Sequence, residues 1–302
     1  MSFDLYFAGV QNNMCEQWLI DNKMCRLLSQ VNDRTYIRNW NDVPNHGKLF
    51  IDSGAYTAYT KGIEINVDEY ISYLNSIDEG LTLFAQVDKI PGIHGQEKTK
   101  QDVEEAPALS WEKYLYMRER VKSPDKLLPI FHRRESWKYL ETMLETTFNG
   151  KHIPYIGIAA TTDSSMLEKK QWFDKVFYKI KNSSNPNVKT HAFGMTSLKM
   201  LEIFPFTSAD STSWIMVGAN GSIMSPFGIV YVSENKSNYP EHILNLPKKA
   251  LEQFITYLDS IGIDFNVIKT NYKYRILANC IYLKNWADNY VYKGSPLKKS
   301  LF

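Results

Sequence analysis

Three aspartates stand directly after short apolar runs, at positions where a strand would end. Asp52 follows "LFI", Asp88 follows "LFAQV", and Asp210 follows "FTSA". A buried carboxylate is costly unless it is paired or hydrogen-bonded, so the three together point to a shared site. Two carboxylates facing one pocket permit displacement at a sugar carbon: one attacks C1′, and the other moves a proton to or from the leaving group. The third acid suits contact with a base edge.

Further polar and small residues follow the same apolar runs. These additional candidates are Ser53, Gly54, His132, Arg133, Arg134, Gly157, Ile158, His191 and Gly194. Small residues beside an acid let a flat heterocycle approach the backbone, and the pair Arg133 and Arg134 suits bidentate binding of phosphate. In the last third of the chain, Lys273 and Arg275 lie among tyrosines, a mixture suited to phosphates and stacked bases. The alternative for both basic pairs is an ordinary solvated helix surface.

These candidates require a scaffold of alternating strands and helices. Runs typical of strands occupy residues 5–10, 49–51, 81–87, 127–131, 155–159, 190–193 and 206–209. Segments with helical spacing of apolar residues lie between them, at 17–30, 67–77, 111–121, 136–148, 166–180 and 197–204. This alternation predicts a parallel sheet covered by helices, and seven strands over about 210 residues favour a (β/α)8 TIM-like barrel. The active site of such a barrel forms at the carboxyl ends of its strands, where the aspartates stand.

The pattern changes beyond Asp210. "GANGSIMSPFGIVYVS" predicts a hairpin insert, and residues 247–261 and 267–286 predict two longer helices. We expect the eighth strand at 229–232 or in a distorted segment. No linker or repeat divides the chain, so residues 1–302 are expected to form one domain, with a barrel core of about 3–232 and a C-terminal helical part of about 245–290.

Composition narrows the class of protein. The 302 residues are 44% hydrophobic and carry a net charge of +2, which suits one large core and is too small to indicate nucleic-acid binding by itself. No apolar run approaches the roughly 18 residues of a membrane helix, and the start lacks the features of a signal peptide. We therefore expect no membrane association and a cytoplasmic location.

Metal and cofactor signatures are missing from the sequence. Cys15, Cys25 and Cys280 have no CxxC spacing, and the histidines show no HxH, HxxxH or 2-His-carboxylate spacing. The glycine-rich loops that bind dinucleotides or nucleoside triphosphates are also missing. The expected chemistry uses no metal and no cofactor.

The order of the strand ends resembles that of the tRNA-guanine transglycosylases and their DNA-acting, 7-deazaguanine-inserting relatives. "FIDSGAY" resembles the family's "DSGG(F/Y)Q", "AQVD" its base-recognising segment, "YIGIAA" its "GLAVG", "HAFGM" its "MGVG", and "SADSTSW" its nucleophile segment. The resemblance covers about residues 3–230. It implies a barrel that exchanges a guanine in a nucleic acid for a 7-deazaguanine without breaking the backbone.

The resemblance also assigns roles to the candidates. Asp210 would attack C1′ of the target guanosine to form a covalent glycosyl-enzyme, Asp52 would be the general acid and base, and Asp88 would accept hydrogen bonds from the base. Gly157 and Ile158 would present backbone groups to the base. The other substrate-binding positions would be Ser53, Gly54, His132, His191 and Gly194, with nucleic-acid contacts from Arg133, Arg134, Lys273 and Arg275.

Differences between this sequence and the family's motifs indicate which nucleic acid is the substrate. The CxCxxC and His zinc site of the tRNA enzymes is missing, and "ADST" replaces "DCVLPTR". These differences favour a compact relative from phage or bacterial DNA-modification systems, with DNA as partner and a preQ0-like 7-deazaguanine as the inserted base. The alternatives are the same exchange on tRNA, an inactive nucleic-acid-binding barrel subunit, and an unrelated barrel glycosidase. The oligomeric state stays open.

Overall fold

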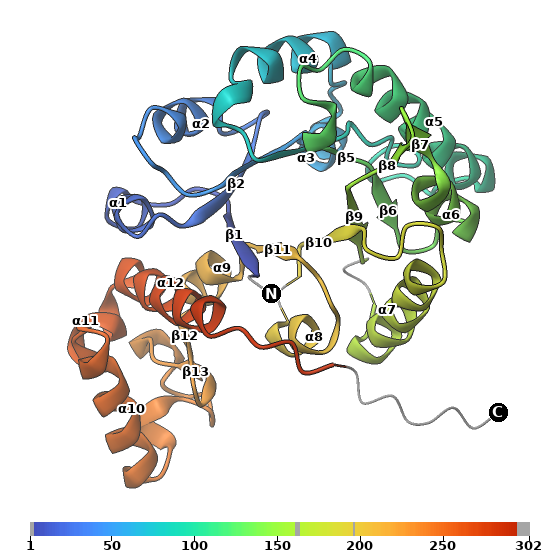
Figure 1. Ribbon diagram of the computed structural model, residues 1–302. Helices are drawn as coiled ribbons and strands as arrows, with labels where there is room; N and C mark the ends of the chain where they lie inside the picture. The colour runs from blue at the N-terminus through green and yellow to red at the C-terminus, as the bar shows by residue number, and fades with distance from the viewer. Residues whose placement is uncertain (1–2, 161–163, 196, 295–302) are drawn as a thin grey trace, which may run out of the picture.

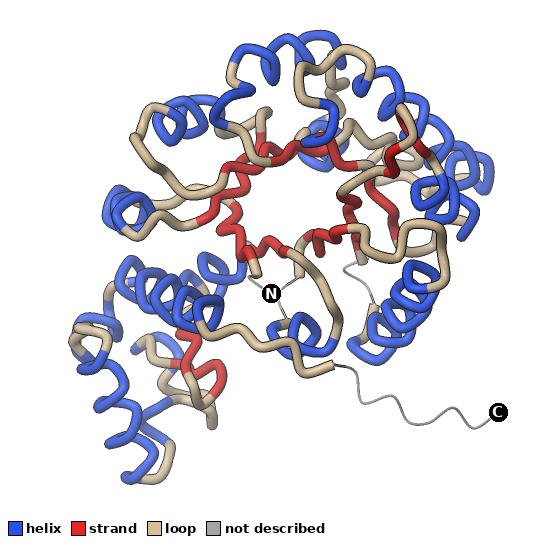
Figure 2. Tube along the Cα trace, in the orientation of Figure 1, coloured by secondary structure: helices blue, strands red, loops and turns tan. Residues whose placement is uncertain are grey.

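One parallel sheet dominates the molecule. The computed structural model describes residues 3–160, 164–195 and 197–294 (Figure 1). Within them, nine parallel strands form a sheet in the order β5-β4-β3-β2-β1-β11-β10-β9-β6. Their bounds are β1 Asp4–Ala8, β2 Cys25–Ser29, β3 Leu49–Asp52, β4 Leu83–Ala85, β5 Leu127–Leu128, β6 Ile130–His132, β9 Tyr155–Ala159, β10 Lys189–Phe193 and β11 Ser208–Ser211. Figure 2 shows these strands curving into a ring.

The ring is nearly closed at Pro129. This proline alone separates the two end strands, β5 and β6. On one side the carbonyl of Leu128 accepts from the N–H of Gln86 at 3.1 Å, and on the other the carbonyl of Pro129 accepts from the N–H of Gly157 at 2.8 Å. Proline has no N–H for the ladder, so the strand is interrupted there. With β5 and β6 taken as one interrupted strand, the ring has eight members, which is consistent with a TIM-like barrel.

Helices follow the strands and surround the ring (Figure 1). They are α1 Asn13–Asp21, α2 Arg34–Asn41, α3 Ala55–Lys61, α4 Val67–Ser76, α5 Lys100–Arg118, α6 Trp137–Glu145, α7 Met166–Lys181, α8 Leu198–Ile203 and α9 Ser213–Ala219. A short antiparallel pair, β7 Thr147–Phe148 and β8 Lys151–His152, precedes β9. The predicted helix at 111–121 is the second half of α5, which begins earlier because Thr99 and Asp102 form a capping box.

Side chains alternate between the inside of the ring and the helix layer. On β3, Phe50 belongs to the inner cluster with Tyr6 and Leu27, whereas Leu49 and Ile51 pack outward against the helices. Successive residues of a strand point to opposite faces. Asp52 therefore points to the same side as Phe50, into the ring.

The prediction for residues 17–30 was wrong in its second half. Helix α1 ends at Asp21, Lys23 adopts a left-handed φ of 52°, and the chain then enters β2. This strand completes the ring, whereas the strand expected at 229–232 is part of the predicted hairpin. That hairpin is formed by β12 Ser222–Ser225 and β13 Gly228–Tyr231, in a separate two-stranded sheet.

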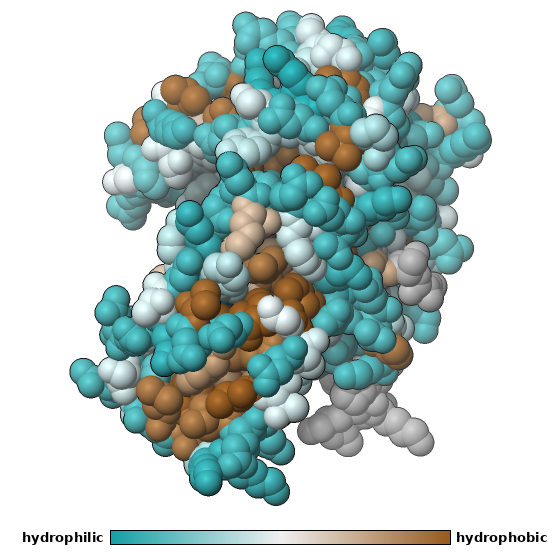
Figure 3. Space-filling model, turned by 90° about the vertical axis from the view of Figure 1, so that its left-hand side faces the viewer, coloured by the Kyte–Doolittle hydropathy of each residue, from teal (hydrophilic) through white to brown (hydrophobic). Residues whose placement is uncertain are grey.

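The C-terminal part lies outside the ring beside α9 (Figure 1). It contains α10 Lys248–Ser260, α11 Phe265–Thr270 and α12 Tyr272–Asp288, which pack with the hairpin around a core of their own. The helix predicted at 267–286 is two helices, because Asn271 leaves the helical conformation and its side chain caps α12. Figure 3 shows a broad brown area over this part of the molecule, so its outer surface is more apolar than that of the neighbouring helices.

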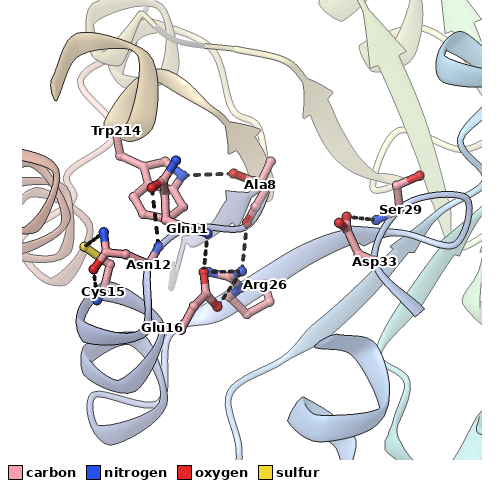
Figure 4. A network of polar contacts seen from close by, with 10 residues as sticks. Ala8, Gln11, Asn12, Cys15, Glu16, Arg26, Ser29, Asp33 and Trp214 are labelled. Atoms are coloured by element: carbon pink, nitrogen blue, oxygen red, sulfur yellow. Dashed lines mark hydrogen bonds and ion pairs between the residues drawn. The ribbon is translucent and has the colours of Figure 1, made fainter. Parts of the chain in front are cut away.

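A buried ion pair supports β2 from the helix side. Arg26 is fully buried, and its Nη2 lies 2.8 Å from the carbonyl of Gly9 and 3.1 Å from the carboxylate of Glu16 (Figure 4). Its guanidinium also lies 5.6 Å from the ring of Trp40 and 5.9 Å from that of Trp214. Burial raises the pKa of Glu16 although Arg26 is so close. The pair is thus a charge contact largely removed from water.

Glu16→Ala is expected to lower the free energy of unfolding by about 3 kcal/mol, because it leaves the buried Arg26 without its counter-charge. Urea unfolding monitored by tryptophan fluorescence measures the loss. Glu119→Ala is the matched control, since Glu119 pairs with Arg120 on the exposed surface at 3.0 Å and should cost less than about 1 kcal/mol. Equal losses in the two variants would contradict this account of Arg26.

Candidate active site

The aspartates of β3 and β11 point into the ring at the carboxyl ends of the strands, which we call the barrel mouth. Asp210 shares the inward face of β11 with Ser208, since Ala209 between them packs outward. Two strands, β2 and β1, stand between β3 and β11, so the two backbones are about 14 Å apart along the curved wall. Their side chains reduce that separation, and the charge of Asp210 contributes to the pKa of Asp52. Asp52 and Asp210 therefore both face the interior of the ring near the carboxyl ends of their strands.

Backbone groups hold Asp52 at the end of β3, and its pKa is raised. Its carbonyl accepts from the N–H of Gln30 at 3.0 Å, and its Oδ2 accepts from the N–H of Gly54 at 3.0 Å. Burial raises the pKa of this carboxyl to about 7; the bond from Gly54 opposes the shift, and the charges of Asp210 and Asp88 add to it. A carboxyl with a pKa near neutrality exists in both protonation states at pH 7, as a general acid and base requires.

The turn after Asp52 is built for packing. Ser53 is buried, and its carbonyl accepts from Nε2 of Gln30 at 3.1 Å. Gly54 has a left-handed φ of 75°, and a Cβ there would lie 2.5 Å from Cγ2 of Val31. The glycine thus makes room for Val31, whereas the sequence analysis gave that room to a heterocycle.

Asp210 is held by two donors. Its Oδ1 accepts from the N–H of Gly194 at 2.8 Å and from Nε2 of His191 at 3.2 Å. Nδ1 of His191 lies 2.6 Å from Oγ of Ser208, which lies 2.8 Å from the hydroxyl of Tyr155. His191 and Gly194 therefore contact the predicted nucleophile itself, although the sequence analysis placed them against the substrate.

A second carboxylate cluster surrounds His132. Oδ2 of Asp88 lies 3.2 Å from Nε2 of His132, and Oε1 of Glu135 lies 3.0 Å from its Nδ1. Burial opposes charge on this ring, yet the carboxylates of Asp88 and Glu135 raise the pKa of His132 to about 10. Oδ1 of Asp88 accepts from Nε2 of Gln86. His132 is thus a cation whose two N–H groups are committed to acids.

Gly157 and Ile158 do not offer an open backbone. The N–H of Gly157 is bonded to the carbonyl of Pro129, and a Cβ at Gly157 would lie 2.5 Å from Cε2 of Phe193. Ile158 packs outward in the core between sheet and helices. In this structure the ring of Phe193 occupies the surface that the resemblance assigns to a base.

A cavity of about 390 Å³ opens at the barrel mouth. Asp52, Asp88 and His132 line its polar side, and Ile130 and Phe193 belong to its apolar side. Its exposed lining residues include Lys89, Lys98, Arg134 and Tyr56. The volume is within the range of small-molecule sites, and acids lie inside a basic rim. Asp210 is not among the residues that line this cavity. A larger hollow of about 790 Å³ lies outside the ring beside α7 and is lined by none of the three aspartates.

The four predicted phosphate contacts have different surroundings. Arg133 lines the cavity and donates to Oγ of Ser164 at 2.6 Å, and the exposed Arg134 lines it with a left-handed φ of 83°. Lys273 is exposed at the start of α12. Arg275 is buried and donates to the carbonyls of Gly218 at 2.9 Å and Ile268 at 2.7 Å. This corrects the sequence analysis, because Arg275 joins parts of the fold and is not available to a phosphate.

Sequence reasoning missed several members of the site. They are Tyr155 and Ser208 in the chain to His191, Gln86 and Glu135 around Asp88 and His132, Phe193 over Gly157, and the rim residues Lys89 and Lys98. Some of these residues could have been found from the alternation of side chains along a strand, because residues two positions apart face the same side. Ser208 is two residues before Asp210, and Tyr155 is two before Gly157, so each shares an inward face with a candidate.

No protein-family model matches this chain, and no curated protein matches it in sequence. Within residues 3–160, 164–195 and 197–294, no three His, Cys, Asp or Glu side chains are grouped as metal ligands. No helix in that part of the chain is long and apolar enough to cross a membrane.

Proposed function

We propose that this protein is a (β/α)8 transglycosylase that replaces guanine in DNA with a 7-deazaguanine base through a covalent intermediate on Asp210. One observation carries the proposal: two inward-facing aspartates share the barrel mouth in contrasting surroundings. Asp210 is held by the N–H of Gly194 and by His191, whereas burial raises the pKa of Asp52 to about 7. This contrast suits a nucleophile and a proton carrier.

The exchange needs two displacements at C1′. In the first, a lone pair of Asp210 forms a bond to C1′, the bond from C1′ to N9 breaks, and the departing guanine takes a proton from Asp52. In the second, the incoming base loses its N9 proton to Asp52, N9 attacks C1′, and the electron pair of the ester bond returns to Asp210. Each displacement inverts the anomeric carbon, so the product keeps the β configuration.

Asp88 is the proposed acceptor for the N1–H and the exocyclic amine of the base. Its Oδ2 lies 3.2 Å from Nε2 of His132, and a carboxylate can accept several hydrogen bonds. The donors of a guanine edge match such an acceptor. Phe193 must move from Gly157 if the base is also to reach that backbone.

The rim suits a polynucleotide. Lys89, Lys98 and Arg134 are exposed around the cavity and supply positive charge where phosphates would pass. Tyr56, whose side chain is 70% exposed, offers a ring for stacking beside the cavity. A guanine inside a duplex cannot reach the cavity, so the target nucleotide must be flipped out or single-stranded.

Labelled-base incorporation tests the function and the polymer together. We expect radiolabelled 7-deazaguanine of the preQ0 type to enter DNA, with release of an equal amount of guanine. A matched reaction with tRNA should take up no label, and uptake by tRNA alone would transfer the proposal to that polymer. If neither polymer takes up label or releases guanine, and DNA still binds, the inactive-barrel alternative is supported and the transglycosylase proposal is wrong.

A further inference from the structure

With a neutral imidazole at His191, the hydrogen bonds around the ring have one consistent direction. The carboxylate of Asp210 can only accept, so Nε2 of His191 donates to it across 3.2 Å. With the ring proton on Nε2, Nδ1 accepts from the hydroxyl of Ser208 at 2.6 Å, and that hydroxyl accepts from Tyr155 at 2.8 Å. Tyr155 and Ser208 together fix the tautomer in which His191 serves Asp210.

His191 is enclosed and does not face the cavity. Its side chain is fully buried, and the rings of Tyr6, Phe50 and Phe193 stand edge-on to it with centroids 5.8, 4.8 and 4.6 Å away. Neither His191 nor Asp210 is among the residues that line the cavity, but Asp210 is slightly exposed whereas His191 is not exposed at all. An effect of His191 on the reaction must therefore pass through Asp210.

The two oxygens of Asp210 differ. Oδ1 accepts from both Gly194 and His191, while Oδ2 has no hydrogen-bond partner in the part of the chain that the structure describes. Asp210 is also slightly exposed, at 7%. We infer that His191 is a positioning residue that holds Oδ1, so that Oδ2 is the oxygen that attacks C1′. This inference rests on the proposed function, in which Asp210 is the nucleophile.

The arrangement affects the two displacements differently. When Oδ2 bonds to C1′, Oδ1 becomes an ester carbonyl, which accepts hydrogen bonds less strongly than a carboxylate. When the incoming base displaces the ester, the electron pair of the C1′–Oδ2 bond returns to Asp210 and Oδ1 regains charge. The donors Gly194 and His191 thus stabilise the free carboxylate more than the ester. They should speed resolution of the covalent intermediate.

His191→Phe tests the inference, because it keeps a flat ring among the aromatic neighbours and removes the donor. We expect turnover to fall about 10- to 100-fold, the effect of losing one hydrogen bond to a charged group. At the same time, the fraction of protein trapped on DNA as a denaturation-resistant adduct should rise above that of the unmodified protein. His191→Gln, whose amide can still donate to Oδ1, should recover most of the turnover.

The outcomes separate this inference from the proposed function. If the unmodified protein forms no adduct with DNA, the proposed function fails whatever the variants do. If it forms one, the inference is overturned when His191→Phe keeps full turnover, or loses adduct and turnover together while melting normally. Should His191→Phe fail to fold, Ser208→Ala replaces it: this variant frees Nδ1 and should slow turnover with a rise in adduct, and no change would overturn the inference.

Discussion

Asp210→Asn is expected to abolish base exchange, with a fall in kcat of at least about 10⁴-fold. The side-chain amide has nearly the same shape, and its oxygen can still accept from Gly194 and His191, so the surroundings of Oδ1 are kept. The amide nitrogen that replaces Oδ2 is not a nucleophile. Guanine release in a single turnover and gel detection of the covalent adduct measure the loss, and both should disappear.

Asp125→Asn is the control for Asp210→Asn. Asp125 stands just before β5, at the amino ends of the strands, and its 71% exposed side chain pairs with Arg118 at 2.8 Å, so it does not reach the mouth. This variant should keep the exchange activity of the unmodified protein. Retention of more than a small fraction of activity by Asp210→Asn would mean that another group attacks C1′, and the assignment of the nucleophile would be wrong.

The predictable part of the fold is the part with uniform strand patterns. Residues 49–51 and 155–159 are short runs without a charged residue, and each lies in a strand of the ring. Strand β2 was missed because Arg26 interrupts its apolar run, and a charged residue between apolar ones is also what a helix surface contains. Arg26 is tolerated there only because Glu16, Trp40 and Trp214 surround it. Those contacts depend on packing between elements, which local sequence does not contain.

The sequence predicts which residues stand at the candidate site better than it predicts which side chains contact one another there. The rule that sites form at the carboxyl ends of parallel strands places Asp52, Asp88 and Asp210 at one end of the ring. This rule does not predict that His191 contacts Asp210, because that contact depends on the register between β10 and β11. Nor does it show that Arg275 faces Gly218, since the rotation of α12 is set by its packing on the barrel. Strand alternation is readable from sequence, whereas register and helix rotation are not.

Asp52→Asn should slow exchange by about 10²- to 10⁴-fold and remove its dependence on pH near neutrality. Guanine release requires protonated Asp52, so its rate in the unmodified protein should fall as the pH rises through about 7, the pKa that burial gives this carboxyl. Resolution of the adduct requires the ionised form and should fall as the pH decreases through the same value. Single-turnover rates between pH 5 and 9 measure both limbs, and persistence of these limbs in Asp52→Asn would assign them to another group.

The same substitution is expected to stabilise the fold at alkaline pH. The pKa of Asp52 rises from 3.8 to about 7 on folding because burial disfavours the charge, so the folded protein binds the proton more tightly than the unfolded chain. Below about pH 4 the carboxyl is protonated in both states and does not lower the stability of the fold. As the pH rises to about 7 the free energy of unfolding falls, and above that pH it is lower by up to about 4 kcal/mol. Asparagine never ionises, so urea unfolding should find Asp52→Asn more stable than the unmodified protein at pH 8 and nearly equal to it at pH 4.

Asp102→Asn is the control, and it should be less stable than the unmodified protein at pH 8. Hydrogen bonds from Thr99 lower the pKa of Asp102 and stabilise its charged form, which asparagine lacks. If Asp52→Asn is no more stable than the unmodified protein at pH 8, burial does not disfavour the charged form of Asp52 as described.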